Sequence, residues 1–350
     1  MRLEDVLVYL VESSGVSGFE HHVAKLIETS LKELSDEIKN DRLGNVIAYK
    51  KGSGKNPIKI MLAAHMDEIG LMVKDIDKNG FVKITNVGGI DQRILLAQEV
   101  IIHGKKDLFG VIGAKPPHLQ NVEERKEAVK MEDLFIDVGL SKQEVEEFTT
   151  IGDSITIPQK MTKLQNEIIT AKALDDRAGI ATMIECFIEL SKLKHNCDVF
   201  GVATVQEEVG TRGAIVSTFQ IEPDIGIAID MGFGTTPELS KDDTMELGKG
   251  PGIGLGANIH PRIHERFIKV AKEYNIPYQL ELSPGMSGTD AQSMQISQSG
   301  VATGVLSIPL RYMHTTVETV DMKDIKNAGK LLAYFISSLD DDDLEGFLCF

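Results

Sequence analysis

Several residue types are scarce in this 350-residue chain, and each scarcity argues against a class of protein. Tryptophan is absent and aromatic residues make up 5% of the sequence, so few ring platforms are available for sugar binding. Acidic residues outnumber basic ones by 53 to 37, and the net charge of -16 argues against nucleic acid or an anionic membrane surface as the main partner. No apolar run reaches the roughly 18 residues of a membrane span.

Cysteine is also rare. Cys186, Cys197 and Cys349 are odd in number and lack the spacing of a metal site, so we expect small apolar residues rather than a disulfide framework. The first residues, MRLEDVLVYLVESSG, place Glu4 and Asp5 where a secretion leader would be basic and apolar. The expectation is a cytoplasmic protein.

The remaining composition, 42% hydrophobic and 26% charged, is typical of a globular protein. Helical stretches alternate with apolar strands in residues 1–68 and 165–350, which predicts an α/β domain. Between them, residues 69–164 show short alternating strands separated by turn signals, which predicts an inserted β-rich domain. Near the start, Ser17 and Glu20 form a capping-box pattern and predict the beginning of a second helix.

Polar side chains follow the apolar strands of the α/β part, where open sheets commonly bind their ligands. His65 and Asp67 end the strand in IKIMLAAHMDEIG, and their spacing of two places them on one side of an extended chain. A histidine that binds a metal usually has its other nitrogen held by a carboxylate, and Asp67 is placed to do this. A purely structural histidine is the alternative.

Asp175 and Asp176 stand together before a helical stretch of small residues. Adjacent carboxylates repel each other unless cations or donors lie between them, which favours a metal. In the alternative interpretation, Asp176 caps the helix and pairs with Arg177, while Asp175 is exposed. Two further core strands are followed by Asp230 and His314.

The stretch VATVQEEVGT, residues 202–211, places Glu207 and Glu208 side by side just past the end of a strand. On a continuing strand the two side chains would diverge, whereas in a loop they can converge on one site. The simpler alternative is a pair of solvated turn residues.

Together these residues are what a two-metal hydrolase requires. Two imidazoles and three carboxylates are available as ligands: His65, Asp175, Glu208, Asp230 and His314. Zinc accepts both ligand types, and two metals about 3.5–4 Å apart need a carboxylate bridge. Glu207 then remains to take the proton of a metal-bound water, whose pKa zinc lowers to about 7.

The segments AAHMDEIG, KALDDRAG, VQEEVGTRGA, AIDMG, SGTDA and RYMHTTVE, in this order, resemble the tetrahedral aminopeptidases. These are dinuclear metallopeptidases that include glutamyl and deblocking aminopeptidases, and some were once labelled endoglucanases. The resemblance covers essentially the whole chain. It implies a mixed central sheet flanked by helices, as in zinc aminopeptidases, with a PDZ-like or barrel-like insertion used for oligomerisation. It also implies a hollow homo-oligomer, a tetrahedral dodecamer, with active sites facing inward.

The resemblance further implies two divalent metal ions per subunit, with zinc or cobalt expected. The ligands of one metal would be His65, Asp175 and Asp230, and those of the other Asp175, Glu208 and His314, with Asp175 as the bridge. Glu207 would be the general base, and Asp67 would orient His65. This chain has Thr315 and Thr316 after the last histidine ligand, where the family commonly has Ser-Pro.

Three functions are therefore compared. The first is a metal-dependent aminopeptidase that hydrolyses N-terminal residues from peptides, the second a glycoside hydrolase, and the third a non-catalytic metal-binding assembly protein. A glycosidase needs two acids but no histidine ligands, and it usually offers aromatic platforms. The presence of Glu207 as a base favours an enzyme over an assembly protein.

Two other motifs point to different chemistry. GIGLGA, residues 252–257, fits a dinucleotide-binding pattern, but Pro251 and the polar stretch ELGKG stand where a buried strand is needed. Ser287 in SGTDA lacks the Gly-x-Ser-x-Gly pattern of a serine nucleophile, so a glycine-rich turn opening a helix is the simpler interpretation.

Overall fold

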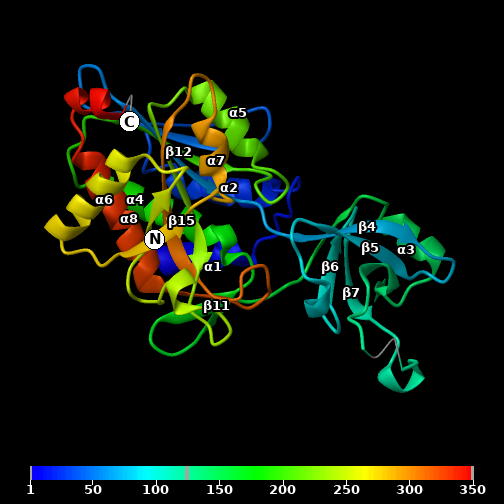
Figure 1. Ribbon diagram of the computed structural model, residues 1–350. Coiled ribbons are helices and arrows are strands. Elements are labelled where there is room, and N and C mark those ends of the chain that lie inside the picture. The colour runs from blue at the N-terminus through cyan, green and yellow to red at the C-terminus, as the bar shows by residue number, and fades with distance from the viewer. Residues whose placement is uncertain (1, 123–125, 348–350) are drawn as a thin grey trace.

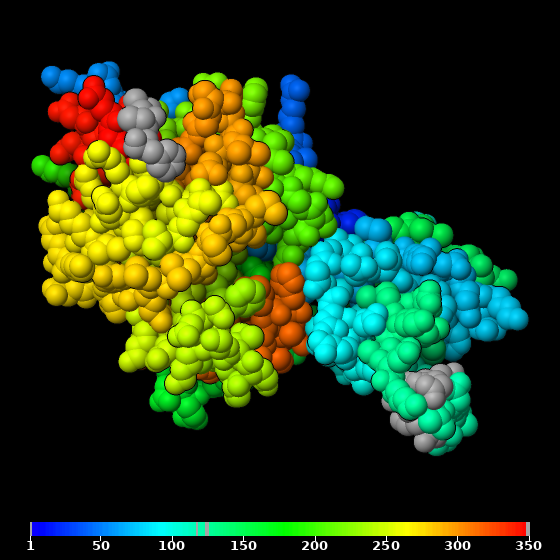
Figure 2. All heavy atoms as spheres, viewed as in Figure 1, coloured from blue at the N-terminus to red at the C-terminus, as the bar shows by residue number. Residues whose placement is uncertain are grey.

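The computed structural model describes residues 2–122 and 126–347, which fold into an α/β body and a smaller β-barrel beside it (Figure 1). In the space-filling view the barrel is a separate lobe set off from the body (Figure 2). None of the helices in this described part combines the length and apolarity needed to cross a bilayer. Cys186 and Cys197 are buried free thiols, whereas Cys349 lies outside the described residues.

The body is built on an eight-stranded mixed sheet. Its strands in chain order are β1 (Glu37–Asn40), β2 (Val46–Lys50), β3 (Lys59–His65), β12 (Asp198–Thr204), β13 (Ile225–Phe233), β14 (Gly252–Gly256), β15 (Gln279–Ser283) and β16 (Ala302–Leu310). Their order in space is β1-β2-β12-β3-β13-β16-β14-β15. The central strands β12, β3, β13 and β16 are parallel, so their C-terminal ends meet at one edge of the sheet.

Helices cover both faces of this sheet. They are α1 (Leu3–Glu12), α2 (His21–Leu31), α4 (Leu174–Leu190), α5 (Arg212–Ile221), α6 (Pro261–Glu273), α7 (Asp290–Gln295) and α8 (Met322–Ser337). Because side chains alternate along a strand, Ile60 and Leu62 of β3 belong to one core with α1, α4 and α8. Met61 and Ala63 belong to a second core with α5 and α7. Burial on both faces explains why this strand is apolar from Ile60 to Ala64.

A small sheet supports the edge where the central strands end. Its antiparallel strands are β10 (Thr162–Lys163), β11 (Ile168–Ala171) and β17 (Glu318–Asp321). Strand β11 leads directly into α4, and β17 leads into α8. This sheet therefore fixes the starting points of two long helices of the body.

The barrel follows β3 in the chain and returns to the body before β10. Six strands close it: β4 (Gly70–Ile76), β5 (Val82–Val87), β6 (Glu99–His103), β7 (Asp107–Gly113), β8 (Phe135–Asp137) and β9 (Ser154–Thr156). Helix α3 (Lys142–Phe148) packs on it (Figure 1). Alternate side chains fill its own core, separate from that of the body. The expected fold class, a mixed α/β structure with a β-rich barrel, is confirmed.

The capping box predicted at Ser17 and Glu20 is wrong. The Ser17 hydroxyl donates to Asp67 Oδ2 at 2.6 Å. The Glu20 carboxylate accepts from the N–H groups of Gly18 and Gln206 at 2.7 and 3.1 Å. Both side chains are buried and bind segments that follow β3 and β12, so tertiary contacts replace the local cap.

Candidate metal centre

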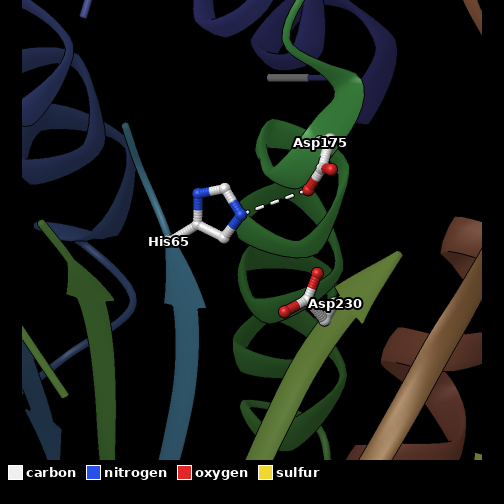
Figure 3. A group of neighbouring side chains, drawn as sticks. All are labelled: His65, Asp175 and Asp230. Carbon is white, nitrogen blue, oxygen red and sulfur yellow. Dashed lines mark hydrogen bonds and ion pairs between the residues drawn. The ribbon is translucent and has the colours of Figure 1, made fainter. Parts of the chain in front are cut away.

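Three side chains from separate elements converge at the edge where the central strands end (Figure 3). His65 ends β3, Asp175 lies at the start of α4, and Asp230 lies on β13. Their potential ligand atoms all lie within 4.8 Å of one another, and all three residues are buried. His65 Nε2 is 3.1 Å from Asp175 Oδ1. Parallel strands that end together, with a helix that starts beside them, produce this convergence.

A second group shares one member with the first and consists of Asp175, Glu208 and His314. His314 Nε2 lies 3.2 Å from Glu208 Oε1 and 3.5 Å from Asp175 Oδ2. Asp175 thus presents one oxygen to His65 and the other to His314. A carboxylate that bridges two metals requires this arrangement. The structure brings together all five predicted ligands.

Glu318, to which the sequence reasoning gave no role, fixes the backbone of two of these residues. Its Oε1 accepts from the N–H of His314 at 2.8 Å, and its Oε2 accepts from the N–H of Asp175 at 3.0 Å. Glu318 is buried, and His314 has a φ of 60°, which is uncommon outside glycine. The only sequence signal is the position of Glu318, four residues after His314 in RYMHTTVE.

The barrel also contacts this centre. The carbonyl of Gly89, just after β5, lies 3.2 Å from His314 Nδ1. Because a carbonyl can only accept, Nδ1 carries the proton, and this leaves Nε2 available as a ligand atom when the imidazole is neutral. A Cβ atom on Gly89 would lie 2.9 Å from Nδ1. Only glycine leaves room for the imidazole at this distance.

Asp67 connects the two glutamates with the end of β3. Its Oδ1 accepts from the N–H of Glu207 at 2.9 Å, and its Oδ2 accepts from the N–H of Glu208 at 3.2 Å. His65 Nδ1 lies 3.1 Å from the Asp67 carbonyl and 3.6 Å from its carboxylate. Although burial raises the pKa of Asp67, the neighbouring His65 ring and the hydrogen bond from Ser17 lower it overall. An ionised Asp67 therefore holds the turn that carries both glutamates.

Glu207 belongs to neither group of potential ligands among the described residues. Burial raises the pKa of Glu207 to about 8, with His65 opposing the shift and Asp290 adding to it. Asp290, at the start of α7, was not identified from the sequence. Its Oδ2 accepts from the Thr204 hydroxyl at 2.6 Å, and its buried Oδ1 has no hydrogen-bond partner within the described ranges. Glu207 is thus a partly buried carboxyl group that lies beside both groups of potential ligands without belonging to either.

The alternative interpretation of the aspartate pair is only partly right. The backbone of Asp175 and Asp176 is not helical, and Asp176 Oδ1 accepts from the N–H of Gly179 at 3.1 Å, so Asp176 caps the regular part of α4 as that interpretation expected. However, Asp175 is buried rather than exposed, and Arg177 donates to the Leu10 carbonyl at 2.8 Å instead of pairing with Asp176. The alternative for the glutamate pair, two solvated turn residues, is wrong as well because both are partly buried.

The charges of the centre fit divalent cations. Burial raises the pKa of Asp230 well above its usual value, and repulsion from Asp176 and Asp175 adds to the shift. Hydrogen bonds to Asp175 and Glu208 raise the pKa of His314 to about 11. The carboxylates thus draw positive charge toward the centre. A divalent ion supplies such charge and prefers imidazole nitrogen and carboxylate oxygen as ligands, which are the atoms that converge here.

The two motifs set aside in the sequence have structural roles. SGTDA opens α7, with Ser287 Oγ 2.9 Å from Thr289 Oγ1, which is the turn expected there. The three glycines of GIGLGA all lie within β14 rather than in a loop between a strand and a helix. The dinucleotide interpretation is therefore wrong.

Comparisons with known proteins agree with the resemblance inferred from the motifs. A family model described as M42 glutamyl aminopeptidase matches residues 44–331. Lysyl aminopeptidase from Pyrococcus furiosus is 42% identical over 340 residues, which is 96% of this chain and 97% of the relative. The solved structure of aminopeptidase APDkam598 from Desulfurococcus kamchatkensis is 37% identical with a TM-score of 0.92, covering 99% of this chain and 98% of that one.

A further solved structure is informative about assembly. The TET1 peptidase of Pyrococcus horikoshii, described as able to assemble into a tetrahedron or a large octahedral shell, is 32% identical with a TM-score of 0.85. The match covers 97% of this chain and 100% of that one. The predicted resemblance to tetrahedral aminopeptidases is confirmed.

Proposed function

Because the chain belongs to the M42 glutamyl aminopeptidase family, whose members hydrolyse peptides, we propose that it removes N-terminal residues from peptides with two divalent metal ions bound at the candidate metal centre. The observation that carries this proposal is the sharing of Asp175 between two groups of potential ligands. His65 and Asp230 complete one site, and Glu208 and His314 complete the other. Zinc or cobalt is the expected ion, since both accept imidazole and carboxylate ligands.

The metals would supply Lewis acidity, which polarises the peptide carbonyl and makes water a better nucleophile. The carboxylate of Glu207 accepts a proton from the attacking water and passes it to the nitrogen of the departing amine. Asp67 holds the backbone of Glu207 at 2.9 Å and thereby positions the base. The side chain of His65 contacts Asp67 through Nδ1, which leaves Nε2 directed at the centre.

Carboxylates around the centre also suit the recognition of a free N-terminus. The α-amine of a peptide has a pKa of about 7.7–8.0, so much of it is cationic at neutral pH. Asp175, Glu207, Glu208 and Asp230 can accept charge-assisted hydrogen bonds from the protonated amine, and only its neutral form would bind a metal. Acetylation removes the charge and part of the fit, so a free N-terminus is the preferred substrate.

Digestion of a matched pair of peptides tests this function. With zinc, cobalt or manganese added, a peptide with a free N-terminus should be shortened one residue at a time, and its N-acetylated form should react far more slowly. Mass spectrometry over a time course separates stepwise shortening from internal cuts. Internal cuts or equal rates would reject the aminopeptidase assignment and leave a broader metal-dependent amide hydrolase. Chelation should abolish the activity, and restoring the metal should recover it.

The other two functions are not favoured. A glycosidase has no use for imidazole ligands, and two histidines lie in the candidate centre. A non-catalytic assembly protein is at odds with membership of a family of peptide hydrolases. Assembly itself remains part of the proposal: the chain forms a homo-oligomer, a tetrahedral dodecamer, with residues 69–164 as the oligomerisation domain. A solved relative described as assembling into a tetrahedron supports this.

A further inference from the structure

A cavity of about 450 Å³ lies beside the candidate metal centre, over strands β13, β16, β14 and β15. Its lining includes Met231, the neighbour of Asp230 in the chain. It also includes Ser307 of β16, which is the register partner of Asp230 on β13. Adjacent strands are about 4.8 Å apart, so the wall of the cavity begins one strand away from a proposed metal ligand.

Glycines keep this face of the sheet open. A Cβ atom on Gly232, two residues after Asp230, would lie 2.7 Å from Glu281 Oε1. A Cβ atom on Gly252, the first glycine of GIGLGA, would lie 3.3 Å from Glu281 Cβ. Glu281 is on the edge strand β15, yet its carboxylate extends over the glycines and accepts from the Ser307 hydroxyl. Gly232 and Gly252 thus leave room for two side chains, that of Met245, which lies nearest to both glycines, and that of Glu281.

The charged side chains of the cavity are all acidic. Asp242, Asp243 and Glu281 line it, and no lysine, arginine or histidine does so among the residues that the structure describes. The other large side chains of the wall are apolar: Met231, Phe233, Met245, Leu280, Leu282 and Met286. A cavity with apolar walls and carboxylates fits a ligand with an aliphatic stem and a cationic end.

Glu281 forms no ion pair with any residue that the structure describes. Burial raises the pKa of this carboxyl, and the hydrogen bond from Ser307 only partly opposes the shift. No hydrogen bond to its Oε1 is seen within the described residues, and this oxygen faces Gly232. A cation placed there would form a charge-assisted hydrogen bond with a partly desolvated carboxylate, which is stronger than a neutral one.

We propose that this cavity receives the side chain of the substrate's N-terminal residue and selects lysine or arginine, with Glu281 as the specificity-determining residue. The proposal rests on the aminopeptidase function proposed above. Asp242 and Asp243 add negative charge to the same cavity. The names of the relatives do not decide which side chain is preferred. One relative is a lysyl aminopeptidase, which implies a cationic residue, whereas the family is described as glutamyl aminopeptidase, which implies an anionic one.

Aminoacyl chromogenic substrates test the selection on the full-length, metal-loaded protein. Lysine is compared with norleucine, which has a similar aliphatic stem but no charge, and with glutamate. The unmodified protein should have a kcat/KM for lysine at least about tenfold above that for norleucine, and glutamate should be poorest. Glu281→Gln keeps the size of the side chain, and it should reduce the lysine-to-norleucine ratio by about 10–100-fold.

Glu273→Gln is the matched control, because Glu273 is an exposed acid at the end of α6 and does not line the cavity. This variant should keep the ratio of the unmodified protein. An equal loss on lysine and norleucine in Glu281→Gln would overturn the proposal and assign Glu281 to the α-amine instead. A preference of the unmodified protein for norleucine or glutamate over lysine would overturn it as well.

Calorimetry distinguishes failure of the pocket from failure of the proposed function. L-lysinamide should bind the unmodified protein at least about tenfold more tightly than L-norleucinamide, and Glu281→Gln should remove most of that difference. If the two amides differ in binding as expected but no aminoacyl substrate is hydrolysed, the aminopeptidase function is rejected and the cation pocket stands. If aminoacyl substrates are hydrolysed but the two amides bind equally tightly, only the cation pocket is rejected.

Discussion

Glu207 and Glu208 are neighbours in the chain but have different surroundings. Glu208 lies in a group of potential ligands with Asp175 and His314, whereas Glu207 belongs to no such group in the described part of the chain. The N–H groups of both glutamates are held by the same carboxylate, that of Asp67. The backbone contacts are therefore equivalent, and the direction of each side chain separates the two proposed roles.

Substitution of each glutamate by glutamine should separate these roles. Glu207→Gln should lower turnover by about 10²–10⁴-fold or more, as loss of a general base does, while both metals stay bound. Glu208→Gln should lose metal in addition to activity, since an amide is a weaker ligand than a carboxylate. Metal content measured by mass spectrometry of the purified variants decides between them. The same metal content in both variants would contradict the assignment.

At the scale of single residues, the sequence predicts side chains that could bind a metal directly. It does not reveal side chains whose role is to accept or donate hydrogen bonds that hold those residues in place. His65 and Asp175 are recognisable because a histidine with a carboxylate two residues away, and two adjacent carboxylates before a helix, both favour a metal. Glu318 and Ser17 act through hydrogen bonds to groups that only the folded chain brings near. The pattern at Ser17 predicts a local cap, because a sequence pattern cannot show that Asp67, 50 residues away, accepts a hydrogen bond from the Ser17 hydroxyl.

At the scale of elements, long apolar strands were predicted well because burial on both faces leaves a strong signal. Within residues 165–350, the apolar stretches DVFGVATVQ and ATGVLSIPL predict strands, and β12 and β16 cover most of them. Strand β8, Phe135–Asp137, was missed because three residues carry too little periodicity. The strand pattern alone does not show that the barrel closes, because closure depends on which strands pair; only the family resemblance implied a barrel-like insertion.

The link between barrel and body was not predicted from the sequence. The carbonyl of Gly89 contacts His314, and a Cβ atom at position 89 would press on the imidazole ring. Gly89→Ala should therefore displace His314 and weaken metal binding at its site by about 10–100-fold, a typical effect of losing a contact that orients a ligand. Titration of the metal-free protein with zinc, followed by calorimetry, measures this.

A second glycine provides the control for that substitution. In Gly346→Ala the new Cβ atom would meet its nearest neighbour, Arg262, at 3.5 Å, an ordinary contact. Both variants should retain their circular dichroism spectrum and thermal midpoint. Unchanged zinc affinity in Gly89→Ala would show that the barrel does not tune the centre.

At the scale of the whole molecule, exposed apolar side chains mark two surfaces of the single chain. Phe109 and Val111 lie on β7 of the barrel and are 73% and 50% exposed. Ile215 and Phe219 lie on α5 of the body and are 50% and 64% exposed. Exposed apolar patches of this kind often mark contacts between proteins. Either surface could join subunits, but only the first belongs to the proposed oligomerisation domain.

Charge substitutions on the two surfaces test which one joins subunits. Burying a phenylalanine side chain at a subunit contact stabilises the contact by about 1.5–3 kcal/mol, whereas an unpaired aspartate buried there destabilises it by several kcal/mol. Because the particle is symmetric, one substitution per subunit changes every copy of that contact. Phe109→Asp should reduce the mass measured by light scattering from that of the proposed dodecamer to that of a smaller species, with the secondary structure unchanged. Tyr9→Asp, at an exposed residue of α1 outside both surfaces, should leave the mass unchanged. A reduced mass in Phe219→Asp, with Phe109→Asp unaffected, would transfer the assembly role from the barrel to α5.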